Sequence, residues 1–372
     1  MAQRSVPSAP DAARAPVLQP GVGAIRSAHY LPCDPDLALW GRLPCATDRA
    51  VLTVEAGTEV TIDTVSHEGI LEDQGRDPVA FFGAHGVVPG DVLDDVIALA
   101  ASGHPRDPAL DGPHVVTGPI RVRGAEPGDL LGMTLVEALP RVPYGIISNR
   151  HGRGALPGEY PQDPGAVSVF ARVARAGGVD VGTMARVRGG AHDVRFPLAP
   201  FLGIMGVAVA GPVRPHSVPP GPHGGNLDLN LLTVGSTLYL PVQVPGALAY
   251  VGDPHFAQGD GEVALTALEA SLRVTIRFDV LPAADAVAAF GELVGPVAET
   301  AEYLVPTGLD PDLDEAMRRC VRAAIALLRA RYGMDAAHAL AYLSAATDFN
   351  ISQVVDLVKG VHARIRVADF DA

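Results

Sequence analysis

Lysine is nearly missing from this chain of 372 residues, and its absence excludes several kinds of catalysis. The single lysine is Lys359, and it lies in the segment VDLVKGVHARI, which is typical of a solvated helix end. Mechanisms that pair a serine or cysteine nucleophile with a lysine, or that form a Schiff base, would depend on this one residue. We therefore set lysine-based mechanisms aside.

Cysteine is also scarce, and long apolar runs are lacking. Cys33, Cys45 and Cys320 are odd in number and show no CxxC spacing, so we interpret them as inert thiols and not as a disulfide or zinc-ribbon framework. The longest apolar run, residues 201–213, is broken by glycine and proline and is too short to span a bilayer. The first 25 residues have no apolar core of the kind a secretory signal requires. We expect a cytoplasmic protein with no membrane partner.

Basic charge is low relative to acidic charge, which limits the possible partners. The chain has 28 lysine and arginine residues against 42 aspartate and glutamate residues, a formal net charge of −14. Nucleic acid and anionic membranes both require a basic binding face, so we expect neither as a partner. The 48% hydrophobic content indicates a well-buried core, and 41 glycines with 33 prolines favour a turn-rich, mainly β architecture.

The order of patterns along the chain predicts one domain. Residues 1–26 are rich in alanine and proline and are expected to be disordered, and residues 27–372 form the domain. Within it, residues 27–295 are a β-rich body, and residues 296–372 are a helical tail. Helices are expected at residues 310–331, 335–346 and 351–359. Because no linker separates the two parts, we expect the tail to pack on the body.

Two polar turns between residues 221 and 269 hold most of the potential metal ligands. In the second turn, Gly-Asp-Pro-His places Asp253 and His255 two residues apart, and hence on one face of an extended segment. Asp260 and Glu262 repeat this spacing. Because divalent ions take histidine nitrogen and carboxylate oxygen together, such a pair is half of a metal site.

The first turn carries His223 between a proline and two glycines. Gly224 and Gly225 leave backbone N–H groups free to face a ligand or an oxyanion. Asn226 and Asp228 follow within the same turn. Taken singly, each of these residues could belong to an ordinary solvated turn. The density of the whole cluster favours a functional site.

Residues outside this stretch give weaker signals. His67 with Glu68 could add a ligand from a distant part of the chain, and His151 and His216 could orient one. Ser236 lacks the G-x-S-x-G elbow and an adjacent base, so we interpret it as a turn serine. The remaining histidines are interpreted as structural or solvated: His29, His85, His104, His114, His192, His338 and His362.

Several motifs resemble one known family. HGGNLD, LTVGSTLYLPVQVPGALAYVGDPHFAQGDGE and TALE are similar to sequences of the acetamidase/formamidase family, as are LGIMGVA, GAEPGDLL, DLDEAMRRC and SQVVDLVKGVHARI. The resemblance covers most of the chain from about Ala50 onward, and it departs from the family pattern at Thr64–Glu72, TVSHEGILE. It implies a jelly-roll-like β-sandwich body and metal-dependent hydrolysis of a small linear or cyclic amide, with zinc favoured over calcium. Together with the hydrophobic content, it also suggests a homo-oligomer.

The working hypothesis is therefore an amidohydrolase in which Glu262 is the general base for a metal-activated water. Two alternatives stay open: a hydrolase of a related small bond such as a lactam, and a non-enzymatic β-sandwich that binds calcium. We assign metal ligation to Asp253, His255, His223, His67 and Asp228, catalytic roles to Glu262, His223 and Asp260, and substrate contacts to Gly224, Gly225, Asn226 and Gln258.

Overall fold

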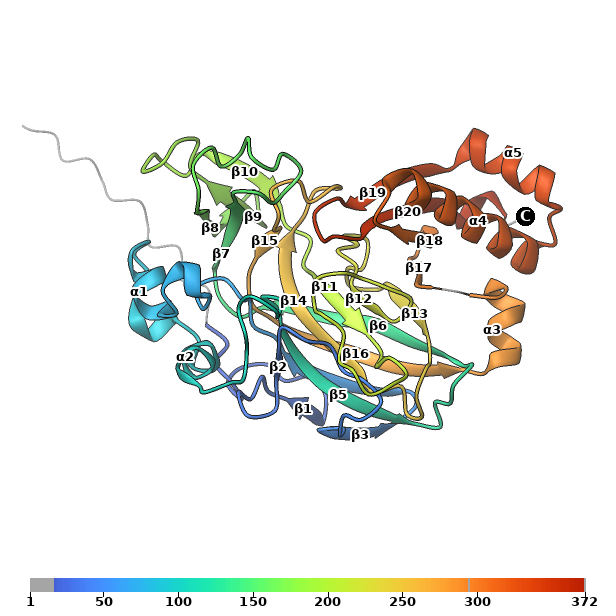
Figure 1. Cartoon of the computed structure of the whole chain (residues 1–372), viewed down its shortest axis with the longest axis horizontal. Coiled ribbons are helices and arrows are strands. Elements are labelled where there is room, and N and C mark those ends of the chain that lie inside the picture. Colours follow the sequence, from blue (N-terminus) through green and yellow to red (C-terminus); the bar gives the residue numbers. More distant parts are fainter. Residues whose placement is uncertain (1–16, 294, 371–372) are drawn as a thin grey trace, which may run out of the picture.

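The computed structural model describes residues 17–293 and 295–370, and two large sheets form its body (Figure 1). The nine-stranded sheet has the order β1 (His29–Leu31), β4 (Thr58–Asp63), β16 (Leu272–Leu281), β6 (Leu130–Pro140), β13 (Thr237–Pro241), β17 (Val297–Glu299), β18 (Tyr303–Asp310), β20 (Lys359–Arg366) and β19 (Asp348–Gln353). The expected mainly β sandwich is confirmed.

The second sheet carries the functional cluster described below. It has the order β10 (Val194–Pro197), β9 (Val179–Met184), β8 (Ala166–Ala176), β7 (Tyr144–Arg150), β15 (Leu268–Glu269), β14 (Ala249–Ala257), β11 (Phe201–Gly206) and β12 (Gly224–Asn226). Strand β14 also pairs with β5 (Val115–Arg123), which holds β2 (Leu39–Trp40) and β3 (Leu52–Glu55).

The core lies where alternating side chains of both sheets meet. In β16, Val274, Ile276 and Phe278 are fully buried, as the period-two pattern of LRVTIRFDVL predicts. They belong to one apolar cluster with Leu131 and Met133 of β6 and with residues of β5, β11 and β14 from the other sheet. The sandwich core is therefore continuous beneath the strands that carry the polar cluster.

Short helices accompany the strands. They are η1 (Glu72–Gln74), α1 (Pro78–Gly83), η2 (Pro89–Asp91), α2 (Asp94–Ala101), α3 (Ala283–Phe290), α4 (Leu313–Tyr332), α5 (Ala336–Ala346) and η3 (Val367–Asp369). Across residues 17–293 and 295–370, no helix has both the length and the apolar character needed to cross a lipid bilayer.

The C-terminal part combines helices with strands. The helices expected at 310–331 and 335–346 are confirmed as α4 and α5, and α4 packs so closely on β18 that a Cβ at Gly308 would lie 2.0 Å from the carbonyl oxygen of Ala316. The helix expected at 351–359 is wrong, because this stretch pairs with β20 as strand β19 and then turns. The tail is thus not only helical: β17 to β20 extend the nine-stranded sheet (Figure 1).

The expected N-terminal disorder does not extend to residues 17–26. Two buried arginines hold this segment: Arg141 Nε donates to the carbonyl oxygen of Leu18 at 3.0 Å, and Arg273 Nη1 donates to that of Val22 at 2.7 Å. The segment is therefore fixed to the body by charge-assisted hydrogen bonds. Residues 1–16 lie outside the described residues.

Candidate active site

Strand β14 presents Asp253 and His255 on the same face, as their spacing predicts. His255 Nε2 lies 3.1 Å from Oδ2 of Asp253, and both side chains are buried. Gly203, on the adjacent strand β11, leaves the space that this arrangement needs. A Cβ at Gly203 would lie 2.5 Å from carboxylate oxygens of both Asp253 and Asp228. A glycine at this position therefore lets two carboxylates and an imidazole meet above the sheet.

Two further histidines approach Asp253 from other elements. His67 lies after β4, and its Nδ1 is 3.4 Å from Oδ1 of Asp253. His114 immediately precedes β5, and its Nε2 is 3.9 Å from the same oxygen. Ser217 Oγ lies 3.0 Å from His114 Nδ1, so the other ring nitrogen is left to face the carboxylate. Asp253 thus stands between His255 on one side and His67 with His114 on the other.

Four more carboxylates complete the buried cluster. Asp228 follows β12, Glu262 lies in the turn after β14, Glu269 is in β15, and Asp356 lies in the turn between β19 and β20. Glu269 Oε1 is 3.0 Å from His255 Nε2. Each of these carboxylates offers an oxygen to one or more groups of potential metal ligands.

Three residues of this cluster have a strained backbone. Asp228, Asp253 and Glu262 have φ values of 47°, 50° and 46°, in the left-handed region that residues with a Cβ rarely adopt. Such conformations cost about 1–3 kcal/mol each and persist where the surrounding structure enforces them, often at functional sites. Three of the residues whose carboxylates converge are thus held in strained backbone conformations.

The electrostatics of the cluster are unfavourable without a cation. Burial and the carboxylates of Glu262 and Asp356 raise the pKa of Asp228 well above its ordinary value, and burial with Asp356 and Glu269 does the same to the pKa of Glu262. The pKa of Asp356 rises to about 7, chiefly through burial. A divalent ion would relieve this mutual repulsion and allow the carboxylates to ionise together.

The pKa values of the two histidines beside Asp253, His67 and His114, are shifted in opposite directions. Although burial opposes it, the nearby carboxylates of Asp253 and Glu68 raise the pKa of His67 to about 10. Burial lowers the pKa of His114 to about 3, so this ring is neutral and its Nε2 is free to bind a cation.

The donor atoms fit a divalent cation. Several buried polar atoms have no hydrogen-bond partner, among them His67 Nδ1, Asp253 Oδ1, His255 Nε2, Glu262 Oε2 and both carboxylate oxygens of Asp228. Unsatisfied buried atoms are costly, and their convergence indicates a missing partner. Among the described residues, four sets have ligand atoms within 4.8 Å of one another: His67–His114–Asp253, Asp228–Asp253–His255, His255–Glu262–Glu269 and Asp228–Glu262–Asp356.

The four sets differ in the chemistry they favour. Two imidazoles with one carboxylate, as in His67–His114–Asp253, match a catalytic zinc site that keeps one position open. The all-carboxylate set Asp228–Glu262–Asp356 instead resembles the oxygen ligands that calcium and magnesium take. Asp253 contributes to the first two sets and therefore links the imidazole half of the cluster to the carboxylate half.

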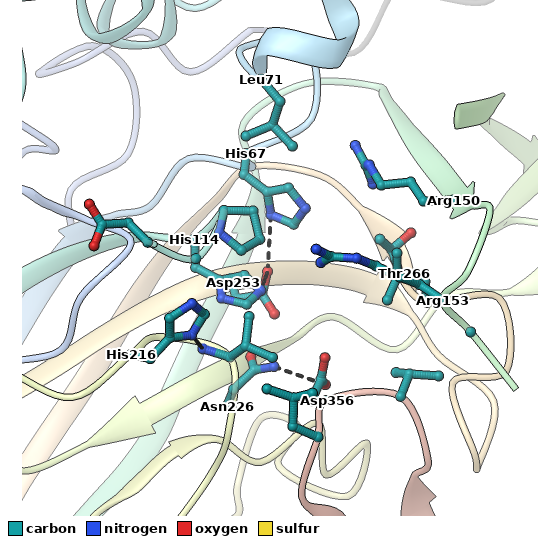
Figure 2. Close-up of a pocket in the computed structure, with 18 of the residues that line it drawn as sticks. His67, Leu71, His114, Arg150, Arg153, His216, Asn226, Asp253, Thr266 and Asp356 are labelled. Atoms are coloured by element: carbon teal, nitrogen blue, oxygen red, sulfur yellow. Dashed lines mark hydrogen bonds and ion pairs between the residues drawn. The ribbon is translucent and has the colours of Figure 1, made fainter. Parts of the chain in front are cut away.

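A cavity of about 780 Å³ opens onto this cluster (Figure 2). His67, His114, Asp253, Glu262 and Asp356 line it, whereas His255 and Asp228 do not. Asn226 also lines the cavity, where its Nδ2 donates to Asp356 at 3.0 Å and its Oδ1 has no partner. The complete His67–His114–Asp253 set is therefore accessible to a substrate, together with Glu262 and Asp356.

Three residues expected in the site lie elsewhere. His223 belongs to none of the four sets among the described residues, and its ring packs against Gly221 and Gly225. Asp260 is exposed, and its carboxylate accepts hydrogen bonds from Asn230, Asn350 and Arg364 in a link between the body and β19–β20. The Gly224 N–H donates to the carbonyl oxygen of Gly221, so it does not face an oxyanion. Gly225 pairs with Met205 in β11, and its carbonyl oxygen accepts from the Leu227 N–H at 3.0 Å.

Gln258 has a different role from the substrate contact expected of it. Its Oε1 lies 3.1 Å from His255 Nδ1, and its amide nitrogen donates to the carbonyl oxygen of Asp228 at 2.7 Å. Gln258 therefore orients His255.

Sequence reasoning missed His114 and Asp356. His114 stands directly before the apolar strand VVTGPIRV, but only the pairing of β5 with β14 brings it beside Asp253. Asp356 lies in a stretch expected to be helical, and the turn that exposes its carboxylate to the cluster exists because β19 pairs back on β20. For Asp356 a signal did exist, because SQVVDLVKG is one of the motifs that carry the resemblance.

Comparison with known proteins identifies a family for the chain. The model of the acetamidase/formamidase family matches residues 91–217 and 212–368. The chain is 31% identical over 223 residues to a candidate formamidase of Schizosaccharomyces pombe, covering 45% of this chain and 52% of that protein. It is 27% identical over 311 residues to a formamidase of Methylophilus methylotrophus, covering 68% and 75%. The chain thus matches only about half the length of the yeast relative.

A solved structure shows the same fold. The acetamidase of Bacillus halodurans superimposes with a TM-score of 0.70 at 23% identity, covering 92% of this chain and 98% of that one. At this identity the likeness establishes the fold alone. The family match extends over most of the chain and includes the residues of the buried cluster from Asp228 to Asp356. This chain belongs to the acetamidase/formamidase family.

Proposed function

We propose that this protein hydrolyses an amide to a carboxylate and ammonia, with a divalent cation, preferably zinc, at the base of the cavity. The observation that carries the proposal is the convergence of His67, His114 and Asp253 on one side of the cavity floor, with Glu262 lining the same cavity. Membership of the family, whose relatives are named formamidase and acetamidase, supports the reaction class.

Asp253, His67 and His114 would hold the cation. This set differs from the ligands expected from the sequence. His114 takes the place of His223, and His255 and Asp228 lie on the far side of Asp253. When bound, the cation would polarise the amide carbonyl and lower the pKa of a water molecule towards neutrality. Glu68 supports the set from outside, because its carboxylate lies 3.4 Å from His67 Nε2 and leaves Nδ1 to face Asp253.

Glu262 is the general base in this proposal. Its Oε2 is buried and free of hydrogen bonds, and the residue lines the cavity beside Glu269. Glu262 takes a proton from the attacking water as the C–O bond forms, and then gives it to the nitrogen as the C–N bond breaks. Glu269 is less suited to this role, since its Oε1 already accepts from the backbone N–H of Ala267 and lies beside His255.

The test combines metal analysis with ammonia release from formamide, acetamide, propionamide and a small lactam, each with and without chelator. We expect zinc to copurify and turnover to stop when it is removed. Glu262→Gln should retain the fold and the metal and lose about 10²- to 10⁴-fold in kcat, whereas Glu302→Gln, an exposed control, should not. Undiminished activity of Glu262→Gln would remove Glu262 from the mechanism.

The same panel separates the two alternatives. The attacking water would be the same for a linear amide and a lactam, so the choice between them depends on turnover. Preferential turnover of the lactam would assign the protein to cyclic amides. Stoichiometric calcium with no ammonia release from any amide would instead support a non-enzymatic binding module, which the carboxylate set Asp228–Glu262–Asp356 could serve.

A further inference from the structure

The cavity is much larger than the smallest amides require. Its volume of about 780 Å³ lies within the range of roughly 300–1,000 Å³ typical of sites for drug-sized ligands. Formamide or acetamide would occupy a small fraction of it beside His67, His114 and Asp253. The rest of the cavity has walls of its own, and one of them is formed by the loop that follows β7.

This loop places one arginine in the cavity. Arg153 lines the cavity, and Figure 2 shows its side chain extending from the Thr266 side towards His67 and Asp253. Within residues 17–293 and 295–370, no side chain forms a hydrogen bond or ion pair with its guanidinium. Arg153 therefore directs an unneutralised positive charge into the space next to the reacting groups.

The other charged groups of the cavity wall already have partners. Arg150 pairs with Asp73 at 2.6 Å and with Glu68 at 3.3 Å, and Arg106 pairs with Glu72 at 2.6 Å. Lys359 Nζ donates to the carbonyl oxygen of Pro311. The rim acids Glu72, Asp73 and Asp111 are likewise paired with arginines: Arg106, Arg150 and Arg42.

The backbone of the loop that carries Arg153, an exposed residue, is held next to the segment after Glu262. The flanking residues Gly152 and Gly154 both have φ of +81°, which gives the loop a tight double turn around Arg153. The Ala155 N–H donates to the carbonyl oxygen of Val263 at 2.9 Å, and a Cβ at Gly154 would lie 3.1 Å from the carbonyl oxygen of Ala264. The loop is thus pinned to the segment that directly follows the proposed base.

The positive charge of Arg153 also acts on the imidazole of His216, which lines the same cavity. His216 lines the cavity, and its pKa is lowered by burial first and also by the positive charges of Arg42 and Arg153, against the opposing effect of Asp111. The wall thus carries the free charge of Arg153, while the floor carries the acidic cluster.

We infer that the substrate is an amide whose other end carries a carboxylate, and that Arg153 binds this carboxylate. The inference rests on the proposed amide hydrolysis and names its substrate class. A guanidinium matches a carboxylate in geometry and can donate two parallel hydrogen bonds to it. The amide carbonyl would then lie at His67, His114 and Asp253, and the remaining length of the cavity would hold the chain between the two groups.

The test compares two amides of the same shape, succinamate and 4-methylpentanamide, in which an isopropyl group replaces the carboxylate. The zinc-loaded wild-type protein should show a higher kcat/KM for succinamate. In Arg153→Gln the ratio of the two kcat/KM values should fall by about 10- to 100-fold, the loss typical of a charge-assisted hydrogen bond. Arg188→Gln, an exposed arginine outside the cavity wall, should keep the wild-type ratio.

Binding of succinate, followed by calorimetry in the same three proteins, gives a readout independent of turnover. Weaker binding by Arg153→Gln, with equal zinc content, supports the inference. A wild-type ratio near one, or an equal ratio in Arg153→Gln, overturns the inference and leaves amide hydrolysis standing. If no amide releases ammonia, the proposed function fails, and the calorimetry alone decides: unchanged succinate affinity in Arg153→Gln then overturns the carboxylate site as well.

Discussion

The amide oxygen of Gln258 lies 3.1 Å from Nδ1 of His255. Since the amide nitrogen of Gln258 donates to the carbonyl oxygen of Asp228, the oxygen is the acceptor towards the ring, and Nδ1 carries the hydrogen. Nε2 of His255 then faces the carboxylates of Asp253 and Glu269 at 3.1 Å and 3.0 Å. This arrangement is stable only when a second proton or a bound cation compensates the negative charge.

Gln258→Met should therefore weaken cation binding. Without its acceptor, His255 can rotate or change tautomer and no longer orient Asp253, a proposed ligand, and loss of such an orienting group typically costs about 10- to 100-fold in metal affinity or activity. Competition with a chromogenic chelator measures the affinity. Gln243→Met is the control, because Gln243 accepts from Ala210 N–H away from the cavity. Equal zinc affinity in Gln258→Met and wild type would show that His255 needs no such support.

Gly203→Ala tests whether the carboxylates really meet above β11. The added methyl group would lie 2.5 Å from oxygens of Asp228 and Asp253, so these groups must move apart. We expect a loss of zinc binding and a destabilisation of about 1–3 kcal/mol, as is usual for overpacking. Gly90→Ala, which has open space around its Cβ position, should change neither. Chemical denaturation with parallel metal analysis measures both effects, and normal zinc binding by Gly203→Ala would contradict the described geometry.

His223 should affect acid stability and not catalysis. Burial lowers its pKa to about 4, against an unfolded value near 6.5. Between pH 6.5 and 4 the unfolded chain therefore binds a proton that the folded protein does not bind. The neutral, buried ring contributes up to about 3 kcal/mol to the free energy of unfolding, and this contribution is present above pH 6.5 and lost as the pH falls towards 4. His223→Gln should flatten the fall in unfolding free energy between pH 6.5 and 4 and retain zinc. Loss of zinc would restore His223 to the ligand set.

Removal of the cation should destabilise the whole protein. In chelator-treated protein the buried carboxylates repel one another. Zinc at 100 times its Kd should raise the free energy of unfolding by about 2.7 kcal/mol, because it binds the folded state alone. Thermal unfolding during a zinc titration measures this gain. Asp253→Asn should abolish it, because Asp253 serves two of the ligand sets, whereas Asp348→Asn at an exposed position should not. A Tm independent of zinc in the wild-type protein would refute a structural contribution from the cation.

The sequence allowed one half of the site to be predicted. The two-residue spacing of Asp253 and His255 predicted a shared face of a strand, and both side chains do meet on one face of β14, although Asp253 itself has a left-handed φ of 50°. Glu262 and His67 were placed near them on residue type and turn context. Such local rules work because strand geometry fixes which neighbouring side chains share a face.

The other half depends on pairings between distant segments. His114 reaches Asp253 only through the register of β5 against β14, and Asp356 arrives from a loop about a hundred residues beyond Asp253 along the chain. His223 was misplaced because its two glycines allow a left-handed turn that aims the ring at Gly221 and Gly225, away from the carboxylates. The apolar pattern around residue 356 was compatible with a helix, and only the partner strand β20 decided against it.

We propose that His67, His114 and Asp253 together hold a catalytic cation at the base of the cavity. Anomalous diffraction from zinc-soaked crystals, recorded on both sides of the zinc absorption edge, tests it most directly. We predict one strong anomalous peak within bonding distance of His67 Nδ1, His114 Nε2 and an Asp253 oxygen, with its open side facing the cavity. An anomalous map with no peak there, or with zinc bound only at the protein surface, would contradict the account.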